Sequence, residues 1–176
     1  MKNIVILYHG DCSDGFSGAW AAWKKFGDKA KYIGVQYKNP VPEGLIDKEI
    51  YLIDFTYKLE QMQKLMAENK RVTSIDHHVS AEAVARLTQD YSFDNNHSGC
   101  VLAWQYFHPK NAIPKFLLYI EDNDIGKWSI KNGEEILAYI RIEEKTFKNW
   151  DGLVRKIENV KSRNKILALG MAIKKF

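Results

Sequence analysis

RVTSIDHH, residues 71–78, joins a short, largely β-branched run to an acid and two adjacent histidines. Such a near-continuously apolar run is typical of a strand that is covered on both faces of a parallel sheet. Two other runs share this character, NIVILY at 3–8 and EIYLID at 49–54. Three side chains that can bind metals or exchange protons therefore stand where a buried strand is expected to end.

Strand and helix patterns alternate over the first hundred residues. Two weaker strand candidates are KYIGVQY at 31–37 and YSFD at 91–94. Helical patterns lie at 15–26, 58–68, 81–87 and 99–107, and after Pro114 at 115–122, 134–142, 146–160 and 165–176. This order predicts βαβ crossovers and an α/β fold: a doubly wound, mostly parallel, Rossmann-like sheet with flanking helices and a helical C-terminal third.

The composition predicts one domain spanning residues 1–176. Hydrophobic residues make up 45% of the chain and charged residues 27%, which is ordinary for a globular protein. No apolar run reaches the roughly 20 residues that a membrane helix needs, and the run before Tyr8 is too short for a signal peptide. Cys12 and Cys100 show no pairing pattern, so we expect two free thiols in a cytoplasmic protein without a membrane partner.

Basic residues are concentrated in the stretch 153–176. Seven lysines and arginines stand there against one glutamate, a net charge of +6 within a chain whose total is +4. Such a stretch could face a phosphate-rich ligand such as nucleic acid. It could equally be the solvated side of an amphipathic helix.

Acids and histidines follow each of the three buried runs. Ligands in open α/β sheets gather at the carboxyl ends of the strands, so these side chains are expected at one edge of one sheet. They are His9, Asp11 and Asp14 after the first run, Asp54 at the end of the second, and Asp76, His77 and His78 at the end of the third. A further acidic group, in YIEDNDIG, follows a helical pattern and could reach the same edge; it comprises Glu121, Asp122 and Asp124.

So many converging acids would repel one another unless cations neutralised them. Carboxylates with a few imidazoles suit Mn²⁺, Mg²⁺ or Fe²⁺ better than Zn²⁺, whose structural sites prefer thiolates. The supply exceeds what one ion requires and suits two ions about 3.5–4 Å apart, bridged by a carboxylate, the arrangement that hydrolyses phosphate esters. In such a centre one ion lowers the pKa of a bound water, and both offset charge on the attacking and leaving oxygens.

Each group also has an ordinary structural explanation. Asp14 could belong to a turn into a helix that Asp11 or Ser13 caps, and Asp54 could cap the next helix through Thr56. One such cluster alone would not decide between these readings. Three clusters at the same sheet edge favour metal binding.

Four motifs, in this order, resemble the DHH phosphoesterase superfamily, which is named for its Asp-His-His signature. They are HGDCSDGFSGA (9–19), LIDF (52–55), DHH (76–78) and EDND (121–124). HSGCVLAWQYF (97–107) is similar to the Ser-Gly helix start that follows the signature. The superfamily includes single-strand-specific exonucleases, nanoRNA and cyclic-dinucleotide phosphodiesterases and manganese-dependent pyrophosphatases. The resemblance covers about the first 130 residues, and the stretch 131–176 would be a helical C-terminal part or connector.

The resemblance implies a role for each matching residue. The implied ligands are His9 and Asp11 for the first ion, Asp54 for both ions, and Asp14, His77 and Asp122 for the second, with Asp124 as the alternative to Asp122. His78 would contact the scissile phosphate and stabilise its charge, and Asp76 would orient an imidazole. The implied substrate contacts are Ser98 and Gly99 in the helix start and Arg155 and Lys156 in the basic stretch.

The chain departs from the family pattern in two places. Two residues separate Asp11 from Asp14 where the family usually has one, so either His9 or Asp11 could be the ligand; a His-Gly-x-Cys-x-Asp-Gly-Phe variant occurs in one branch. The C-terminal domain with a Gly-Gly-Gly-His motif that most members carry is not in this sequence, so the chain is either naturally minimal or truncated. We expect a more open site, which the basic helices or a second subunit of a homodimer could cover.

The function that the resemblance implies is a Mn²⁺-dependent phosphodiesterase with two divalent cations, Mg²⁺ or Fe²⁺ being the alternatives. Its substrate would be a short single-stranded oligonucleotide, a cyclic dinucleotide or a related small nucleotide. A phosphomonoesterase or pyrophosphatase-type hydrolase, and a non-catalytic nucleotide-binding protein, are the other candidates. Four aromatic residues could stack on a base, although the first two are expected in the core: Phe16, Trp20, Phe55 and Tyr57.

Overall fold

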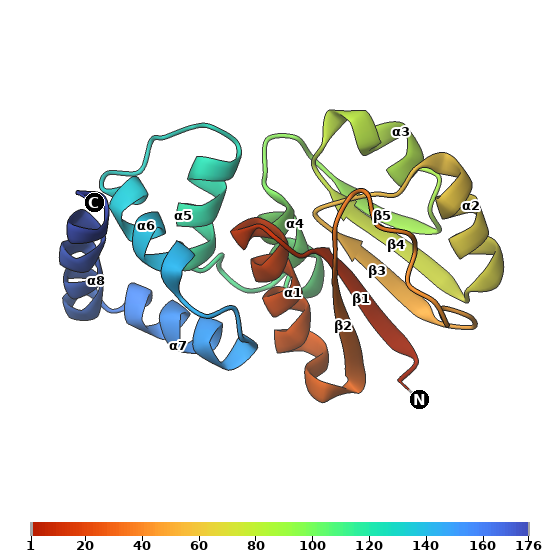
Figure 1. The fold of residues 1–176 in the computed structure, drawn as a ribbon, viewed down its shortest axis with the longest axis horizontal. Helices are drawn as coiled ribbons and strands as arrows, with labels where there is room; N and C mark the ends of the chain where they lie inside the picture. The colour runs from red at the N-terminus through yellow and green to blue at the C-terminus, as the bar shows by residue number, and fades with distance from the viewer. Residues whose placement is uncertain (1, 176) are drawn as a thin grey trace. The chain divides into compact units, whose positions relative to one another are not determined.

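Figure 1 shows the fold in a computed structural model, which describes residues 2–175. The chain divides into two compact units, 1–111 and 112–176, and each is described by itself. This boundary lies before the EDND motif (121–124), so the resemblance over about the first 130 residues extends into the second unit. The expectation that 1–176 acts as one domain stays a prediction.

A five-stranded sheet forms the centre of the first unit. Its strand order is β2-β1-β3-β4-β5, and every neighbouring pair is parallel. The strands are β1 (Ile4–His9), β2 (Ala30–Val35), β3 (Glu49–Ile53), β4 (Arg71–Asp76) and β5 (Asp90–Phe93). The chain leaves β1 for β2 on one side and returns to β3 on the other, which is the strand-order reversal of a doubly wound sheet. The predicted α/β class is confirmed.

The three runs that predicted buried strands form the middle of the sheet as β1, β3 and β4, and the two weaker candidates form its edges. Central strands must be apolar on both faces because helices cover both faces. The helices of this unit are α1 (Ser13–Phe26), η1 (Gly27–Lys29), α2 (Leu59–Glu68), η2 (Val79–Ala81), α3 (Glu82–Ala85) and α4 (Gly99–Phe107). Figure 1 shows α1 and α4 on one side of the sheet and α2 and α3 on the other.

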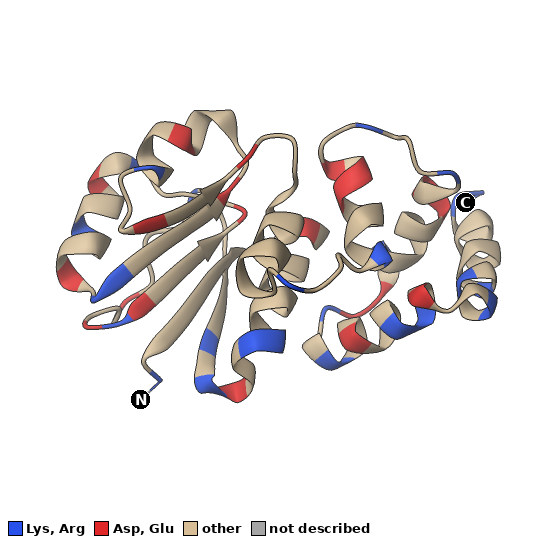
Figure 2. Cartoon of the chain, turned by 180° about the vertical axis from the view of Figure 1, so that it is seen from behind, with Lys and Arg blue, Asp and Glu red and all other residues tan. Residues whose placement is uncertain are grey.

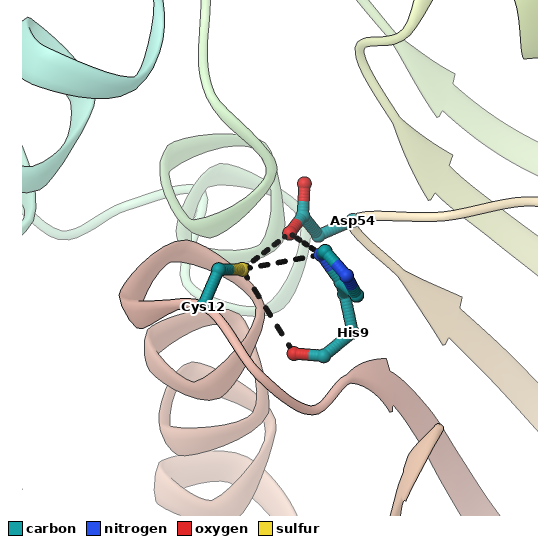
Figure 3. A group of neighbouring side chains, drawn as sticks. All are labelled: His9, Cys12 and Asp54. Carbon is teal, nitrogen blue, oxygen red and sulfur yellow. Dashed lines mark hydrogen bonds and ion pairs between the residues drawn. The ribbon is translucent and has the colours of Figure 1, made fainter. Parts of the chain in front are cut away.

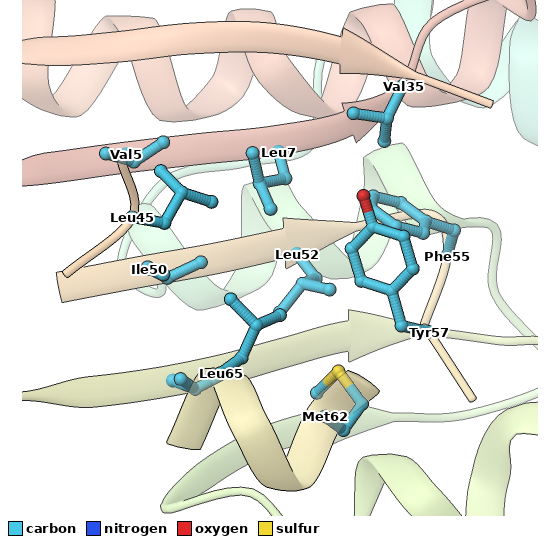
Figure 4. Packing of buried hydrophobic residues seen from close by; sticks show 11 residues of the cluster. Val5, Leu7, Val35, Leu45, Ile50, Leu52, Phe55, Tyr57, Met62 and Leu65 are labelled. Atoms are coloured by element: carbon cyan, nitrogen blue, oxygen red, sulfur yellow. The ribbon is translucent and has the colours of Figure 1, made fainter. Parts of the chain in front are cut away.

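Alternate residues of β1 and β3 point to opposite faces of the sheet, as strand geometry requires. Figure 4 shows Leu7 and Leu52 in a buried cluster with Met62 and Leu65 of α2. Phe55 and Tyr57, only 1% and 4% exposed, belong to this same cluster. Their burial in the core leaves neither ring open for a base to stack on.

The opposite face packs against α1 and α4. Trp20 stacks on Trp104 with 5.5 Å between ring centroids, and Phe16 is also buried, so the prediction that Phe16 and Trp20 pack in the core is confirmed. Gly18 allows α1 to lie very close to the sheet, because a Cβ at this position would be 2.4 Å from Cγ2 of Ile53. The sheet edge and the start of α1 are thereby held together.

Helices α5 (Lys115–Asp124), α6 (Gly133–Ile142), α7 (Phe147–Glu158) and α8 (Val160–Ile173) form the second unit. Their apolar faces meet around Phe116 and Trp150, whose rings lie edge to face at 5.7 Å. The last helix begins earlier than the predicted 165 because Asn159 caps it by accepting from Ser162 N–H; the predicted end at 176 lies outside the described residues. Within 2–175, no helix combines the length and apolarity needed to cross a membrane.

The close packing at Gly18 can be tested by substitution. Gly18→Ala should lower the free energy of unfolding by about 1–3 kcal/mol, because the added methyl group overpacks the contact with Ile53. Gly152→Ala in α7 is the control, since its Cβ would meet nothing within 4 Å and alanine favours a helix by roughly 0.5–1 kcal/mol. Urea denaturation measures both, and an unchanged midpoint for Gly18→Ala would contradict the packing described.

Candidate metal centre

The carboxyl ends of the three central strands bring together an acid and two histidines. His9 ends β1, Asp54 follows β3, and His77 follows β4. Nε2 of His77 lies 3.2 Å from Oδ1 of Asp54, and Nδ1 of His9 lies 3.4 Å from Oδ2. Each oxygen of one carboxylate therefore faces a different imidazole, as the strand-end argument predicts.

Asp54 occupies this position in an unusual backbone conformation. Its φ is +64°, in the left-handed region, and only 2% of the residue is exposed. Its N–H still donates to the carbonyl of Ile75 at 2.9 Å, which ties the turn to the neighbouring strand. Left-handed non-glycine residues cost of order 1–3 kcal/mol and cluster at functional sites. The alternative role as a helix cap does not apply, because Lys58 occupies the N-cap position of α2.

The surroundings of Asp54 favour its charged form. Burial raises the pKa of this carboxyl, but hydrogen bonds with His77, His9, Cys12 and Asp14 outweigh burial and bring it well below its usual value. Asp54 is thus an anion at neutral pH. A buried anion among imidazole nitrogens can act as a ligand for a cation without first losing a proton.

Cys12 completes the group around Asp54, and Figure 3 shows its sulfur joined by dashed lines to both the His9 ring and the carboxylate. Sγ lies 3.1 Å from Oδ2 of Asp54 and 3.3 Å from Nδ1 of His9. Burial, followed by the nearby Asp54 charge, raises the pKa of the thiol. The sequence predicted only a free thiol here. The available signal was spacing, since Cys12 comes three residues after His9 in the turn between a strand and a helix.

The same cysteine caps α1 and thereby decides where its neighbours point. Sγ accepts from Gly15 N–H at 3.1 Å, so Cys12, not Asp11 or Ser13, is the N-cap. Asp11 lies outside the cluster: it is exposed, and its Oδ2 accepts from the amide of Gln36 at 2.5 Å. The first motif left either His9 or Asp11 as the ligand. Of these two residues, the structure places His9 next to Asp54.

Asp14 is buried in the first turn of α1 and is held by the start of α4. Its Oδ1 accepts from Cys100 N–H at 3.0 Å, where the positive end of the helix dipole favours an anion. Ser98 and Gly99 are also buried, and a Cβ on Gly99 would lie 2.7 Å from Cβ of Asp54. The Ser-Gly helix start therefore packs against the acids, and its predicted contact with substrate stays a prediction.

Asp76 holds the His78 ring. Oδ1 lies 2.8 Å from Nδ1 of His78 and accepts from the backbone N–H groups of His77 and His78, while Oδ2 accepts from Thr56 at 2.6 Å. The hydrogen bond to Asp76 raises the pKa of His78. The Tyr37 hydroxyl, which the sequence did not single out, lies 3.3 Å from Nε2 of His78. Asp76 thus orients an imidazole as predicted, and that imidazole is His78.

Four predicted site residues belong to the second unit: Asp122, Asp124, Arg155 and Lys156. Asp122 accepts three hydrogen bonds there, from Ser129 N–H, Ser129 Oγ and Ile130 N–H at 2.6–3.0 Å. Burial opposes ionisation, but these bonds outweigh it and lower the pKa of Asp122. Arg155 pairs with Asp151 on α7, and Asp124 is exposed at the end of α5. The roles of these four residues at the metal centre stay predictions.

Two donor sets in the first unit are close enough to hold a divalent ion. One contains His9, Cys12 and Asp54, and the other contains Asp54, His77 and His78; within each set the donor atoms lie within 4.8 Å of one another. Both sets share Asp54, the arrangement that a carboxylate bridging two ions requires. Nitrogen, sulfur and carboxylate oxygen are all ordinary ligands for divalent transition metals, so these residues fit such ions.

Comparison with known proteins supports the fold. No family model matches the chain. The chain is 29% identical over 164 residues to an uncharacterized protein of Acanthamoeba polyphaga mimivirus, an alignment that covers 84% of this chain and 39% of that protein. A crystal structure of an uncharacterized protein from Helicobacter pylori matches with a TM-score of 0.68 at 18% identity, over 98% of this chain and 62% of that one. The chain thus spans about two fifths of the first protein and just under two thirds of the second, and the structural likeness shows the fold alone.

The hydrogen bonds of Asp122 give a prediction that separates it from Asp124. Asp122→Ala should lower the free energy of unfolding by about 1–3 kcal/mol in EDTA, because the buried carboxylate of Asp122 accepts three hydrogen bonds from Ser129 and Ile130 that the substitution removes. Asp124→Ala, at an exposed position, is the control and should stay within about 0.5 kcal/mol. Thermal and urea unfolding of the two variants measure the difference.

The pH dependence of this difference has a definite sign. The folded-state pKa of Asp122 lies below the usual value near 3.9, so its stabilisation is present above about pH 4 and is lost as the pH falls through the folded-state pKa. The difference in the free energy of unfolding between wild type and Asp122→Ala should therefore shrink as the pH is lowered. A gap that widened at low pH, or equal effects of the two substitutions, would contradict this account of Asp122.

Proposed function

We propose that this protein is a metal-dependent phosphodiesterase that acts on short single-stranded oligonucleotides, cyclic dinucleotides or related small nucleotides. One observation carries the proposal: the buried Asp54 carboxylate faces an imidazole on each oxygen, at the carboxyl ends of three central strands. Two donor sets that share one carboxylate suit a pair of divalent ions. The motif resemblance to DHH phosphoesterases points to the same chemistry.

The proposed ligands are nearly those that the motifs suggest. His9, Cys12 and Asp54 would hold one ion, and Asp54, His77 and Asp14 the other. The motif resemblance implies Mn²⁺, with Mg²⁺ or Fe²⁺ as alternatives, and the Cys12 sulfur favours Fe²⁺ among these three. When bound, such ions supply positive charge to the phosphate oxygens and make water a better nucleophile at neutral pH. Asp54 would hold both ions at a fixed separation, because the backbone around it is tied to β4 and its side chain is buried.

His78 would contact the phosphate directly. Its hydrogen bond to Asp76 raises its pKa and fixes the orientation of its ring, so its other ring nitrogen can donate to a non-bridging oxygen. Asp76 is fully buried and acts as a positioning residue, since its two oxygens accept from Thr56, His77 and His78. The pair would stabilise the charge that develops on the phosphate during cleavage.

Hydrolysis of a simple diester tests the role of Asp54. With Mn²⁺, the 176-residue chain should hydrolyse bis-p-nitrophenyl phosphate or a dinucleotide, and Asp54→Asn should reduce the rate at least ~100-fold, because the carboxylate between both donor sets loses its charge. Asp11→Asn is the matched control and should retain activity, since Asp11 is exposed and bonded to Gln36.

Three results would count against this assignment. Equal losses in the two variants would remove the special role of Asp54. Release of phosphate from pyrophosphate without diester cleavage would favour a pyrophosphatase. Nucleotide binding without turnover would favour a non-catalytic binding protein.

Cys12 should leave a spectroscopic signature on a bound metal. Titration with Co²⁺ should give a thiolate-to-metal charge-transfer band in the near ultraviolet, because Sγ stands among the donors of the first set. Cys12→Ser should abolish the band, whereas the matched control Cys100→Ser should keep it. Sulfur also favours Fe²⁺, Co²⁺ and Zn²⁺ over Mg²⁺, so Cys12→Asp should shift the affinity order towards Mg²⁺ and Mn²⁺. A band that persists in Cys12→Ser would exclude the cysteine as a ligand.

A further inference from the structure

A groove of about 940 Å³ opens beside the candidate metal centre, within the first unit. One wall is the segment after β2, residues 37–40, and another is the start of α2. Residues 55–58, which join β3 to α2, also line the groove. Its volume is at the upper end of the range for sites that hold a whole small-molecule ligand. Its lining combines aromatic rings with lysines, and of these residues only Phe55 belongs to a motif quoted above.

The groove adjoins the metal centre through two residues. Tyr37 lines the groove, and its ring centroid lies 4.9 Å from that of His9 while its hydroxyl lies 3.3 Å from Nε2 of His78. Thr56 also lines the groove and donates to Asp76, which holds His78. A ligand whose phosphate lies at His78 would therefore extend directly into the groove.

Tyr37 offers an aromatic surface at this junction. The residue is 53% exposed, unlike the buried Phe55 beside it. Its contacts with His9, His78 and Phe55 are edge to face, with interplanar angles of 61°, 85° and 87°. These contacts fix the Tyr37 ring in place, and none of the three neighbouring rings lies parallel to it. A fixed, half-exposed ring is suited to stack on a planar ligand group such as a nucleobase.

The rest of the lining is cationic. Three lysines line the groove, Lys38, Lys58 and Lys64. The one acid among the lining residues is Glu60. Within residues 2–175, neither Lys38 nor Lys58 has an ion-pair partner, whereas Lys64 lies 3.9 Å from Glu68. Figure 2 shows acidic and basic positions alternating along α2, whose N-terminus opens on the groove. Lys58 makes no side-chain cap there, so the N-terminal amides of α2 add to the positive potential.

Tyr57 lies on the inner side of the groove, within the core cluster described above. It lines the groove, is 4% exposed, and its hydroxyl has no hydrogen-bond partner within the described residues. Buried hydroxyls are nearly always paired, and an unpaired one costs free energy. Figure 4 shows this hydroxyl directed towards Val35 at the end of β2, next to the segment that forms one wall.

We propose that the groove binds the stretch of a single-stranded oligonucleotide that flanks the cleaved phosphate. The base next to that phosphate stacks on Tyr37, and the phosphates beyond it pair with Lys38, Lys58 and Lys64. Stacking and non-specific phosphate pairing recognise single strands with little sequence preference. This inference rests on the proposed function for the position of the cleaved phosphate, and it selects oligonucleotides longer than a dinucleotide as the substrate class. Pyrophosphate and mononucleotides would leave the groove empty.

Binding measured in EDTA tests the groove without any contribution from turnover. The probes are a fluorescently labelled single-stranded hexanucleotide, as RNA and as DNA, an abasic phosphate chain of the same length, and an oligo-glutamate of matched charge. Fluorescence anisotropy over a salt series gives the affinity and its salt slope. The 176-residue chain should bind the hexanucleotides with a negative salt slope, and should bind them at least tenfold more tightly than oligo-glutamate.

Substitutions separate the two parts of the groove. Tyr37→Ala should weaken hexanucleotide binding about tenfold and leave the abasic chain unaffected, because only the stacked base is lost. Replacing Lys38, Lys58 and Lys64 together with Gln should weaken both probes at least tenfold and flatten the salt slope. The matched control, Gln at Lys25, Lys29 and Lys31, makes the same charge change near the amino end of β2 and should bind as wild type does. Urea unfolding checks that each variant folds.

The outcomes separate this proposal from the proposed activity. Hexanucleotide binding that depends on Tyr37 and the three lysines supports the groove even if no diester is hydrolysed. Equal weakening by the groove and control triple substitutions would overturn it, because the attraction would then be a property of net charge. Equal binding of oligo-glutamate would also overturn it. Turnover of bis-p-nitrophenyl phosphate without hexanucleotide binding would leave a phosphodiesterase and remove the groove as its substrate site.

Discussion

A single buried carboxylate organises the candidate site. Asp54 is 2% exposed, yet it stays ionised because His77 faces one oxygen while His9 and Cys12 face the other. An isolated buried carboxylate would cost much free energy in its charged form, so it would stay protonated and neutral. The fold avoids this by ending three neighbouring strands at the same edge. The side chains that stabilise the Asp54 anion are also the ones that can bind a metal cation.

Small residues allow these charged groups to lie so close to one another. Gly15 lets α1 begin against His9, since a Cβ there would be 2.2 Å from the carbonyl oxygen of His9. Gly99 lets α4 begin against Asp54, and the N–H of Cys100 in the first turn of that helix holds Asp14. Packing and electrostatics are therefore coupled: two helix starts meet the ends of β1 and β3, and the space between them is filled by side chains that bear ligand atoms.

Much of this arrangement was predictable from the sequence. The central strands are near-continuous apolar runs, and β4 and α4 have the predicted bounds of 71–76 and 99–107. The placement of His9, Asp54 and His77 at one edge follows from parallel pairing, which leaves little choice about where strand ends meet. Cys12 was missed because its role depends on a helix cap, and a sulfur cap has no strong sequence signal. That cap also turns Asp11 outward, against the expectation that it joins the ligands.

Tyr37 and the groove were not predictable, because they depend on how the segment after β2 folds back over the sheet edge towards α2. No periodicity describes such a segment. Two of the four aromatic residues that the sequence did single out, Phe55 and Tyr57, are in the core cluster that packs against α2. The exposed ring that adjoins the site comes from a stretch next to Asn39 and Pro40, which read only as the end of a strand.

The central claim is that Asp54 lies between two metal ions. Crystals grown with Mn²⁺ and measured at the manganese absorption edge would locate every bound ion by its anomalous scattering. The account predicts two peaks about 3.5–4 Å apart, one on each oxygen of Asp54. A map with no peak at Asp54, and with manganese only at acids elsewhere in the chain, would contradict it.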